Sequence, residues 1–399
     1  MAIVFVAPTA RVRAAGPGEP GENDVRALWV VRTTLTSPAA VETMVNAARA
    51  GGFNTLLVQV RGRGDSYFAD GLEPRPVSLA ATPAFDPLAD TIARAHEAGM
   101  RVHAWVNVNL VSSASDLPLA RDHVVYRHPE WLMVPRAVAR DVASLDPKNP
   151  EYLGRLARYV RAQPNTLEGL YLSPTDGAAE YAAGIVRDIV QRYDVDGVHL
   201  DYLRYPGDDF DYGRDTLAAF RRSLAGDLQP ADQRKYDARL ASEPFIYTEA
   251  FPVRWRTFRA DRLTRLLATV RAAVKQAKPS AILSAAVAPD STEASGRFLQ
   301  DWRSWLDRDL LDVVCPMAYT TDAKLFAAQI AADYAVAGSH PLWAGIGAYR
   351  LTPAQIVENV QAARRVGVSG IILFSYDSLA EPARGPEYLS QVGRAAFVQ

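Results

Sequence analysis

Short runs of apolar and β-branched residues recur along the chain from Arg26 onward, with amphipathic stretches between them. Eight such runs occur, at residues 26–32, 53–60, 101–109, 196–203, 281–288, 311–319, 341–349 and 369–376. Near-continuous apolar runs of this length are typical of parallel strands whose two faces are both covered. The pattern therefore predicts eight parallel strands that alternate with helices.

The stretches between the runs carry signals at which helices begin and end. Ser37-Pro38 and Asp86-Pro87 each place a capping side chain before a proline, and Thr352 with Gln355 has the spacing of a capping box. Such side chains accept hydrogen bonds from the first backbone N–H groups, and proline fits the first helical turn. Gly367 follows the last of these stretches, where glycine accommodates a left-handed exit. We therefore expect capped helices to connect the strands.

Eight strand–helix units favour a closed α/β barrel, the (β/α)₈ or TIM barrel, over an open doubly wound sheet. No Gly-x-Gly-x-x-Gly follows the first strand, which weakens the dinucleotide-binding alternative. Two stretches exceed a simple connection, residues 110–172 after the third strand and residues 204–258 after the fourth. Because the loops that follow the strands build the site of such barrels, these long insertions are expected to form substrate walls.

The barrel is expected to occupy residues 25–399 as a single domain, after a leader of residues 1–24. The segment Ala2–Ala10 is apolar, and residues 11–24 are rich in Gly, Pro and charge. The leader is therefore either a flexible segment or the remnant of an export signal, which favours a periplasmic or extracellular location over the cytoplasm. No apolar run approaches the ~20 residues that span a bilayer, so no transmembrane segment is expected.

Composition removes several classes of function. The 399 residues include 44 Lys+Arg and 45 Asp+Glu, a formal net charge of −1, with no basic run to attract nucleic acid. The single cysteine, Cys315, excludes an internal disulfide, zinc ribbons and iron–sulfur clusters. Of six histidines, His103 and His199 lie within predicted strands, too few for a usual three-ligand zinc site. Neither a metal nor another cofactor is expected, metal-dependent hydrolysis is the weaker enzymatic alternative, and the oligomeric state is left open.

Polar and aromatic side chains follow the predicted strands at their C-terminal ends, where barrel sites form. Amide, guanidinium and carboxylate groups bond to sugar hydroxyls, and aromatic rings cover the apolar faces of sugars. Gln59 and Arg61 have the same parity in the second strand and are expected to point the same way. The residues expected to hold an oligo- or polysaccharide substrate are Gln59, Arg61, Asp65, Trp105, Asn107, His199, Arg204, Tyr205, Tyr319 and Tyr376.

Asp201 is the strongest catalytic candidate because it lies within a strand between apolar neighbours, where an unpaired carboxylate is costly. Arg61 or Arg204 could keep it ionised, as a nucleophile or base requires. Glycoside hydrolysis usually needs a second carboxyl group as the acid. Asp290, at the end of the fifth strand, is the first choice for that acid.

Other acids compete with Asp290 for this role, namely Asp65, Asp377 and Glu249. An aspartate that follows a strand is often only the N-cap of the next helix. That is the default for Asp322 and a serious alternative for Asp290 and Asp377. The identity of the acid therefore stays open on the sequence alone.

Several motifs stand in a characteristic order: Arg26-Ala-Leu-Trp29, Gln59-Val-Arg61, His103-Ala-Trp105, Asp196-Gly-Val-His199-Leu-Asp201-Tyr-Leu-Arg204-Tyr205-Pro206, Pro316-Met-Ala-Tyr319 and Gly370-Ile-Ile-Leu-Phe374-Ser-Tyr376. Through them the chain resembles the bacterial family 10-like glycosyl hydrolases over roughly residues 25–380. The resemblance implies a TIM barrel and hydrolysis of O-glycosidic bonds in a polysaccharide such as a cell-wall glycan. Two positions depart from the pattern of some members, Tyr202 in place of a second acid and Met317 in place of glutamine.

Two other mechanisms are excluded by single positions or motifs. Leu203 stands where chitinase-type barrels carry their acidic glutamate, and it cannot donate a proton. No Gly-x-Ser-x-Gly supports a serine nucleophile. The non-enzymatic alternative is a catalytically inactive barrel that binds glycans, because the motifs contain no obvious glutamate.

Overall fold

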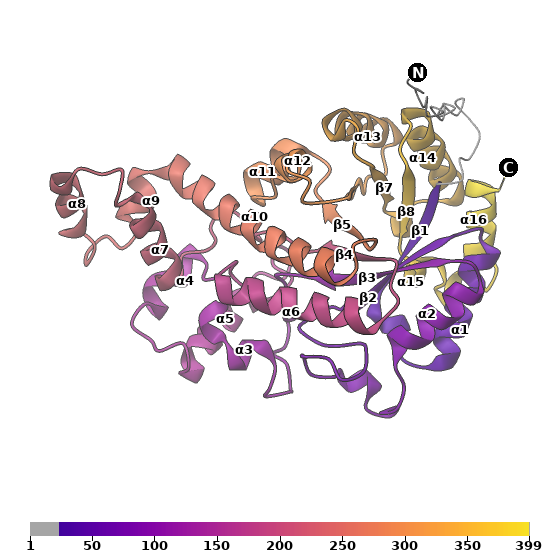
Figure 1. Ribbon diagram of the computed structural model, residues 1–399, viewed down its shortest axis with the longest axis horizontal. Helices are drawn as coiled ribbons and strands as arrows, with labels where there is room; N and C mark the ends of the chain where they lie inside the picture. The colour runs from indigo at the N-terminus through magenta and orange to yellow at the C-terminus, as the bar shows by residue number, and fades with distance from the viewer. Residues whose placement is uncertain (1–23, 399) are drawn as a thin grey trace, which may run out of the picture.

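The computed structural model describes residues 24–398, in which eight parallel strands form a sheet surrounded by helices (Figure 1). The hydrogen-bonded order is β6-β5-β4-β3-β2-β1-β8-β7. Isolated parallel bridges, Val314 to Leu342 and Met317 to Gly345, connect β6 with β7, so the barrel is nearly closed. The predicted (β/α)₈ barrel is confirmed. The leader expected over residues 1–24 lies, apart from Asp24, outside the described residues.

The strands are shorter than the apolar runs because several runs continue into the loops above the barrel. They are β1 Val25–Val30, β2 Thr55–Arg61, β3 Arg101–Asn107, β4 Gly197–Asp201, β5 Ile282–Val287, β6 Val313–Pro316, β7 Trp343–Ile346 and β8 Gly370–Phe374. The helices are α1 Pro38–Ala50, α2 Pro87–Glu97, α3 Val124–Arg127, α4 Arg136–Val142, α5 Pro150–Arg161, α6 Asp176–Arg192, α7 Arg214–Leu224, α8 Pro230–Asp237, α9 Ile246–Ala250, α10 Pro252–Ala277, α11 Ser291–Arg297, α12 Trp302–Asp307, α13 Ala323–Ala337, α14 Pro353–Val366, α15 Tyr376–Leu379 and α16 Tyr388–Phe397.

Helix starts follow the predicted capping residues. The Ser37 side chain accepts a hydrogen bond from the backbone of α1, and Asp86 accepts two from the backbone of α2. Thr352 and Gln355 form the predicted capping box of α14, which ends at Gly367 with a φ of 95°. That left-handed conformation carries no steric cost at glycine because glycine has no Cβ. Local sequence therefore defines where these three helices begin.

Successive side chains of each strand point alternately to two buried layers, one between the strands and the helices and one inside the barrel. On β1, Leu28 and Val30 pack toward the surrounding helices, whereas Ala27 and Trp29 pack inside the barrel. Trp105 from β3 fills the same interior cluster. Because successive strand residues point to opposite faces, one apolar run supplies both layers. This explains why the strands read as continuous apolar runs in the sequence.

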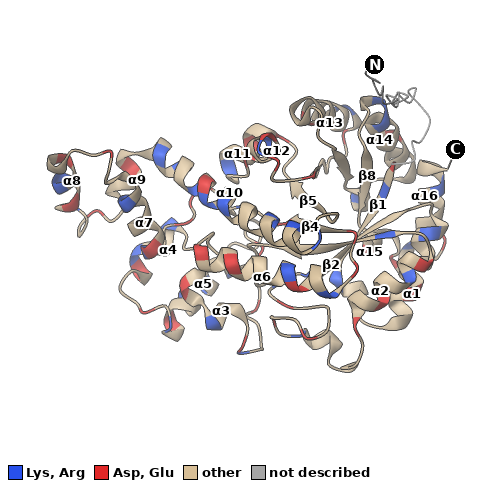
Figure 2. Ribbon diagram, in the orientation of Figure 1, with Lys and Arg blue, Asp and Glu red and all other residues tan. Residues whose placement is uncertain are grey.

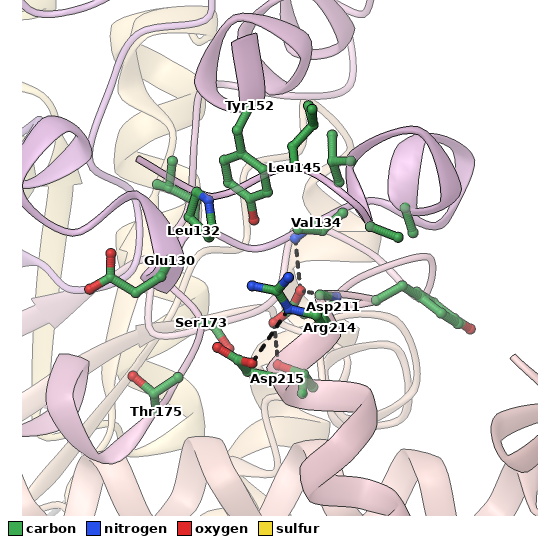
Figure 3. Close-up of a pocket in the computed structure, with 17 residues that line it drawn as sticks. Glu130, Leu132, Val134, Leu145, Tyr152, Ser173, Thr175, Asp211, Arg214 and Asp215 are labelled. Carbon is green, nitrogen blue, oxygen red and sulfur yellow. Dashed lines mark hydrogen bonds and ion pairs between the residues drawn. The ribbon is translucent and has the colours of Figure 1, made fainter. Parts of the chain in front are cut away.

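The segments after β3 and β4 extend beyond the C-terminal face of the barrel. The first contains α3, α4 and α5 before α6, and the second contains α7, α8, α9 and the start of α10 (Figure 1). Buried Asp211 connects them, since its Oδ1 accepts a hydrogen bond from the backbone N–H of Val134 at 2.7 Å (Figure 3). Its Oδ2 accepts another from Thr216 at 2.7 Å. The Asp211 side chain therefore joins the two segments through the backbone of Val134.

The outer helices carry Lys and Arg mixed with Asp and Glu, without a continuous surface of one sign along the helices in view (Figure 2). This distribution agrees with the net charge of −1. Within residues 24–398, no helix is both long and apolar enough to span a membrane.

Two histidines are enclosed within the barrel, His103 on β3 and His199 on β4. Burial lowers the pKa of His103 to about 4 and that of His199 to about 3. His199 accepts a hydrogen bond from the indole of Trp29 at 3.0 Å and contacts the hydroxyl of Ser284 at 2.9 Å. Both imidazoles are therefore neutral at pH 7 and act as packed polar side chains.

We predict that the protein loses stability between pH 6.5 and pH 4. The unfolded histidines have a pKa of about 6.5, above the folded values, so the unfolded chain binds protons first as the pH falls. Each histidine should remove about 2 kcal/mol from the free energy of unfolding between pH 7 and pH 5. Urea denaturation at both pH values measures the loss. His103→Leu should make it smaller by about that amount, and an unchanged loss would contradict the assignment.

Candidate active site

A cavity of ≈ 700 Å³ opens at the C-terminal ends of the strands, and we call it the central cavity. Its wall comes from β1 to β5 and from β8, from the loops after β1, β2, β5, β6 and β7, and from the segments after β3 and β4. Aromatic side chains form much of the lining: Trp29, Trp105, Tyr171, Tyr202, Phe298, Tyr319, Tyr349 and Phe374. The charged lining residues are Arg32, Arg63, Glu168, Asp201, Arg204, Glu293 and Arg297. Aromatic faces among charged and amide groups are the surfaces that sugars require.

Asp201 ends β4 and lies in the wall of the central cavity with a residue exposure of 6%. Its backbone carbonyl accepts from the N–H of Val108 at 2.7 Å, and its Oδ1 accepts from the N–H of Tyr202 at 2.6 Å. Burial raises the pKa of the Asp201 carboxyl, while the nearby Arg204 guanidinium opposes that rise. Of the two arginines considered from the sequence, Arg204 is the one that acts on Asp201.

Arg204 connects Asp201 to a second carboxyl group, that of Glu168. Its Nη2 lies 3.7 Å from Oε1 of Glu168. The guanidinium carbon also lies 4.4 Å from the ring centre of Tyr202, a cation–π distance. Tyr202 has a φ of 50°, an uncommon value for a bulky residue, and this backbone bend lies directly after Asp201. One cation is therefore shared by an aspartate from β4 and a glutamate from a distant segment.

Glu168 was not predicted, and it reaches the site because its segment returns to the end of β3. Tyr171 forms an antiparallel bridge with Leu110, and the N–H of Leu170 donates to the hydroxyl of Ser112 at 3.0 Å. The Tyr171 hydroxyl in turn donates to Oε2 of Glu168 at 2.8 Å. The local signal was weak, because Glu168 is one polar position within the apolar stretch 167–172 of a long insertion.

Asn109 helps to hold this segment. Its side-chain amide donates to the carbonyl of Leu172 at 2.8 Å, and its backbone carbonyl accepts from the N–H of Leu172 at 2.7 Å. Asn109, which follows β3, therefore binds the backbone of this segment rather than a ligand. It fixes the strand-like stretch from which Glu168 projects.

Gln59, Asn107 and Trp105 were predicted to contact substrate, and all three line the central cavity. The Gln59 amide donates to Oδ1 of Asn107 at 3.3 Å, and the Trp105 indole donates to the same oxygen at 3.0 Å. Arg32 donates to Oε1 of Gln59 at 2.9 Å. These bonds hold the amide groups in fixed orientations at the cavity floor.

Tyr319 and Arg204, which were also predicted to contact substrate, line the central cavity. The Tyr319 ring stacks on Phe374 with centroids 5.5 Å apart and meets the edge of Trp29 at 6.2 Å. Burial raises the pKa of the Tyr319 hydroxyl, and the charge of Asp201 adds to the effect. A protonated phenol beside Asp201 is available as a hydrogen-bond donor or acceptor.

Arg61 and Asp65 do not line the central cavity. The pairing of β2 with β3 shifts register between Gln59 and Arg61, so their shared parity does not make them point the same way. Arg61 is instead buried against Glu73, with Nε 2.6 Å from Oε2. Asp65 accepts hydrogen bonds from the N–H groups of Gly62 and Arg63 and so stabilises the turn after β2. Both residues therefore stabilise the chain next to the cavity without lining it.

His199, Tyr205 and Tyr376 are likewise absent from the cavity lining. His199 lies under Trp29, to which it is hydrogen-bonded. Tyr205 is fully buried beside Arg259, and Tyr376 is buried in α15. Position at the end of a strand did not distinguish the residues that line the cavity from those buried behind its lining.

The carboxyl groups that the sequence offered as the catalytic acid make other hydrogen bonds or ion pairs. Asp290 is the N-cap of α11 and accepts from the N–H groups of Thr292 and Glu293 at 2.8 and 2.9 Å. Asp377 accepts from the N–H of Val31 at 2.8 Å. Glu249 pairs with Arg136 on the surface, and Asp65 holds the turn after β2.

Among residues 24–398, the carboxyl groups that line the central cavity besides Asp201 are therefore Glu168 and Glu293. Glu293 pairs with Arg297 at 3.3 Å within the exposed helix α11. Glu168 shares Arg204 with Asp201, so it is the carboxyl group whose surroundings are coupled to those of Asp201.

Comparison with known proteins places the chain in a family. The profile of the family described as glycosyl hydrolase-like 10 matches residues 24–160 and 156–340. "Glycosyl hydrolase YngK" of Bacillus subtilis is 23% identical over 289 residues, 67% of this chain and 46% of that protein. "Glycosyl hydrolase DigH" of Escherichia coli K12 is 23% identical over 299 residues, 67% of this chain and 55% of that protein. The chain thus spans about half the length of these relatives.

Solved structures of glycoside hydrolases have a similar fold. The PgaB (BpsB) glycoside hydrolase domain of Bordetella bronchiseptica has a TM-score of 0.62 at 13% identity, with 92% of this chain and 98% of that chain covered. The β-amylase catalytic domain of Paenibacillus polymyxa has a TM-score of 0.59 at 11% identity, with 94% and 98% covered. At these identities the likeness concerns the fold.

We predict that Gly169→Ala destabilises the segment that carries Glu168. A Cβ at this position would overlap the backbone carbonyl oxygen of Ser112, so the segment must shift. The free energy of unfolding should fall by about 1–3 kcal/mol, measured by urea denaturation. Gly226→Ala is the matched control, because its Cβ would have no heavy atom within 4 Å. Equal stability of the two variants would contradict the close packing of Gly169 against Ser112.

Proposed function

Because the chain belongs to the glycosyl hydrolase-like 10 family, we propose that it hydrolyses O-glycosidic bonds of a polysaccharide, such as a cell-wall glycan, at the central cavity. The observation that carries the proposal is the buried carboxyl group of Asp201 beside Arg204 and Glu168. Two carboxyl groups in unlike surroundings are the catalytic requirement of most glycosidases. The aromatic lining supports a sugar substrate, since rings can cover its apolar faces.

In this proposal Asp201 is the acid. Burial raises its pKa, and a carboxyl group with a raised pKa retains the proton that the leaving oxygen needs. The sequence alone had suggested the ionised role, on the expectation that an arginine would dominate. Burial is the larger effect on Asp201, and the opposing effect of Arg204 is smaller.

Glu168 is the second carboxyl group. Its side chain is 44% exposed at the cavity wall and is held by Arg204 and the Tyr171 hydroxyl. As the glycosidic C–O bond breaks, Asp201 gives its proton to the departing oxygen. Glu168 either takes a proton from the attacking water or attacks the sugar carbon itself. The first route inverts the anomeric configuration and the second retains it, so NMR of the first product distinguishes them.

We predict that Asp201→Asn and Glu168→Gln each lower kcat/KM on the cleaved glycan by about 10³-fold. Neither amide can donate or accept the proton at the required step. Reducing-end release from several polysaccharides measures the effect. Asp290→Asn is the matched control, since asparagine keeps the N-cap of α11 and should keep activity.

Two outcomes would contradict this assignment. Near-normal activity of Asp201→Asn would remove Asp201 from the chemistry. Binding of glycan by the unmodified protein without any reducing-end release would favour the inactive, glycan-binding barrel instead.

We further predict that Arg204→Gln moves the alkaline limb of the kcat/KM profile to higher pH. Arg204 lowers the pKa of Asp201, so its removal raises that pKa and extends the pH range in which Asp201 is protonated. Arg204→Lys retains the positive charge and should leave the limb closer to its original position. A shift of the acid limb alone would show that Asp201 acts in its ionised form.

A further inference from the structure

The arginines around the central cavity differ in what balances their charge. Arg204 lies 3.7 Å from Glu168, and Arg297 lies 3.3 Å from Glu293. Arg32 and Arg63 line the part of the wall where β1 and β2 end, and we call them the Arg32–Arg63 pair. Within residues 24–398, neither member of this pair lies within 4 Å of a carboxylate oxygen. The cationic side of the cavity is therefore beside β1 and β2.

Arg63 presents a half-buried guanidinium without a partner. Across residues 24–398 its side chain makes no hydrogen bond or ion pair, although its backbone is firmly held. Its N–H donates to Oδ1 of Asp65 at 2.9 Å, and its carbonyl contacts Nε2 of His123 at 2.7 Å. The charge of Arg63 also acts on the hydroxyl of Tyr202, the residue that follows Asp201. A fixed turn thus directs an unbalanced cation into the same cavity as Asp201.

Arg32 is held in place by neutral groups. Its Nη1 donates to Oε1 of Gln59 at 2.9 Å. Gly62 lies beneath it, and a Cβ at that position would meet Arg32 Cδ at 2.5 Å. The absence of a side chain at Gly62 therefore lets Arg32 lie flat across the turn. This contact fixes the position of the charge without neutralising it.

We propose that the Arg32–Arg63 pair is a subsite for a carboxylate carried by a sugar unit of the substrate, so that the protein acts on acidic glycans. This inference rests on the proposed function of the central cavity. A planar guanidinium binds a carboxylate with two parallel hydrogen bonds, and its partial burial strengthens the attraction. A neutral sugar would leave two half-buried cations without a counter-charge.

The other acids of the cavity favour a single negative charge over a double one. Glu168 and Glu293 line the same cavity, and each carboxylate repels an anionic ligand, whereas Asp201 is neutral while it retains its proton. A carboxylate carries one charge, whereas a phosphate monoester carries close to two at pH 7. The subsite is therefore suited to a uronic-acid type of sugar unit rather than to a phosphorylated one.

Binding of a matched pair of oligosaccharides tests the proposal. The probes are hyaluronan oligosaccharides, which contain glucuronate, and the same oligosaccharides after reduction of their carboxyl groups. Asp201→Asn is used for calorimetry so that no cleavage occurs. We expect the acidic probe to bind at least tenfold more tightly, and the preference to weaken as NaCl screens the charges.

The matched variants locate the effect. Adding Arg63→Gln or Arg32→Gln should bring the ratio of the two affinities close to one, while adding Arg63→Lys should keep part of the preference. Arg121→Gln is the control, because Arg121 stacks on Tyr126 outside the central cavity. Circular dichroism confirms that each variant is folded. Arg63 makes no side-chain bond within residues 24–398, so its loss should not affect folding.

Equal binding of the two probes, no detectable binding of either, or a preference that survives Arg63→Gln would overturn the carboxylate subsite. Failure of the proposed function is a separate result. A protein that prefers the acidic probe but releases no reducing ends from any glycan would retain the subsite and lose the hydrolase assignment.

Discussion

The site depends on the charge of Arg204, which lies 3.7 Å from Glu168 and opposes the rise in the pKa of buried Asp201. Asp201 is buried at the end of β4, and without a nearby cation its charged form would be far more costly there. Glu168 comes from a segment more than thirty residues earlier and meets the same guanidinium at 3.7 Å. The cation therefore opposes the effect of burial on the pKa of Asp201 and pairs with the second carboxyl group. It also stacks over Tyr202, whose unusual backbone conformation follows directly after Asp201.

This arrangement requires the long segment after β3 to return to the barrel. The antiparallel bridge between Leu110 and Tyr171 satisfies backbone groups that a loose loop would have to expose or leave unpaired. Asn109 closes the same contact with both its side chain and its backbone. On the outer side, Asp211 joins this segment to the one after β4. Hydrogen bonds within the segment after β3, and between it and the segment after β4, therefore hold this part of the chain beside the cavity.

The charged residues around the cavity form two groups that lie at the ends of different strands. Asp201, Arg204 and Glu168 form a balanced group beside β4. Beside β1 and β2, the Arg32 side chain is held by the neutral Gln59 side chain, and Arg63 is held through its backbone. An acid that must retain its proton and a subsite that attracts anions therefore lie at different strand ends of one cavity.

The sequence determined the barrel, the capped starts of several helices and the place of Asp201, because apolar periodicity, capping and strand-end position are local properties. Tertiary structure decided which strand-end residues face the cavity. A register shift directs Arg61 to Glu73, and the capping bonds of Asp290 keep it out of the cavity. Glu168 could not be identified from the sequence, because it reaches the cavity only when the insertion after β3 folds back and pairs with the chain at the end of that strand. Burial, which sets the pKa of Asp201, is likewise a property of the assembled barrel.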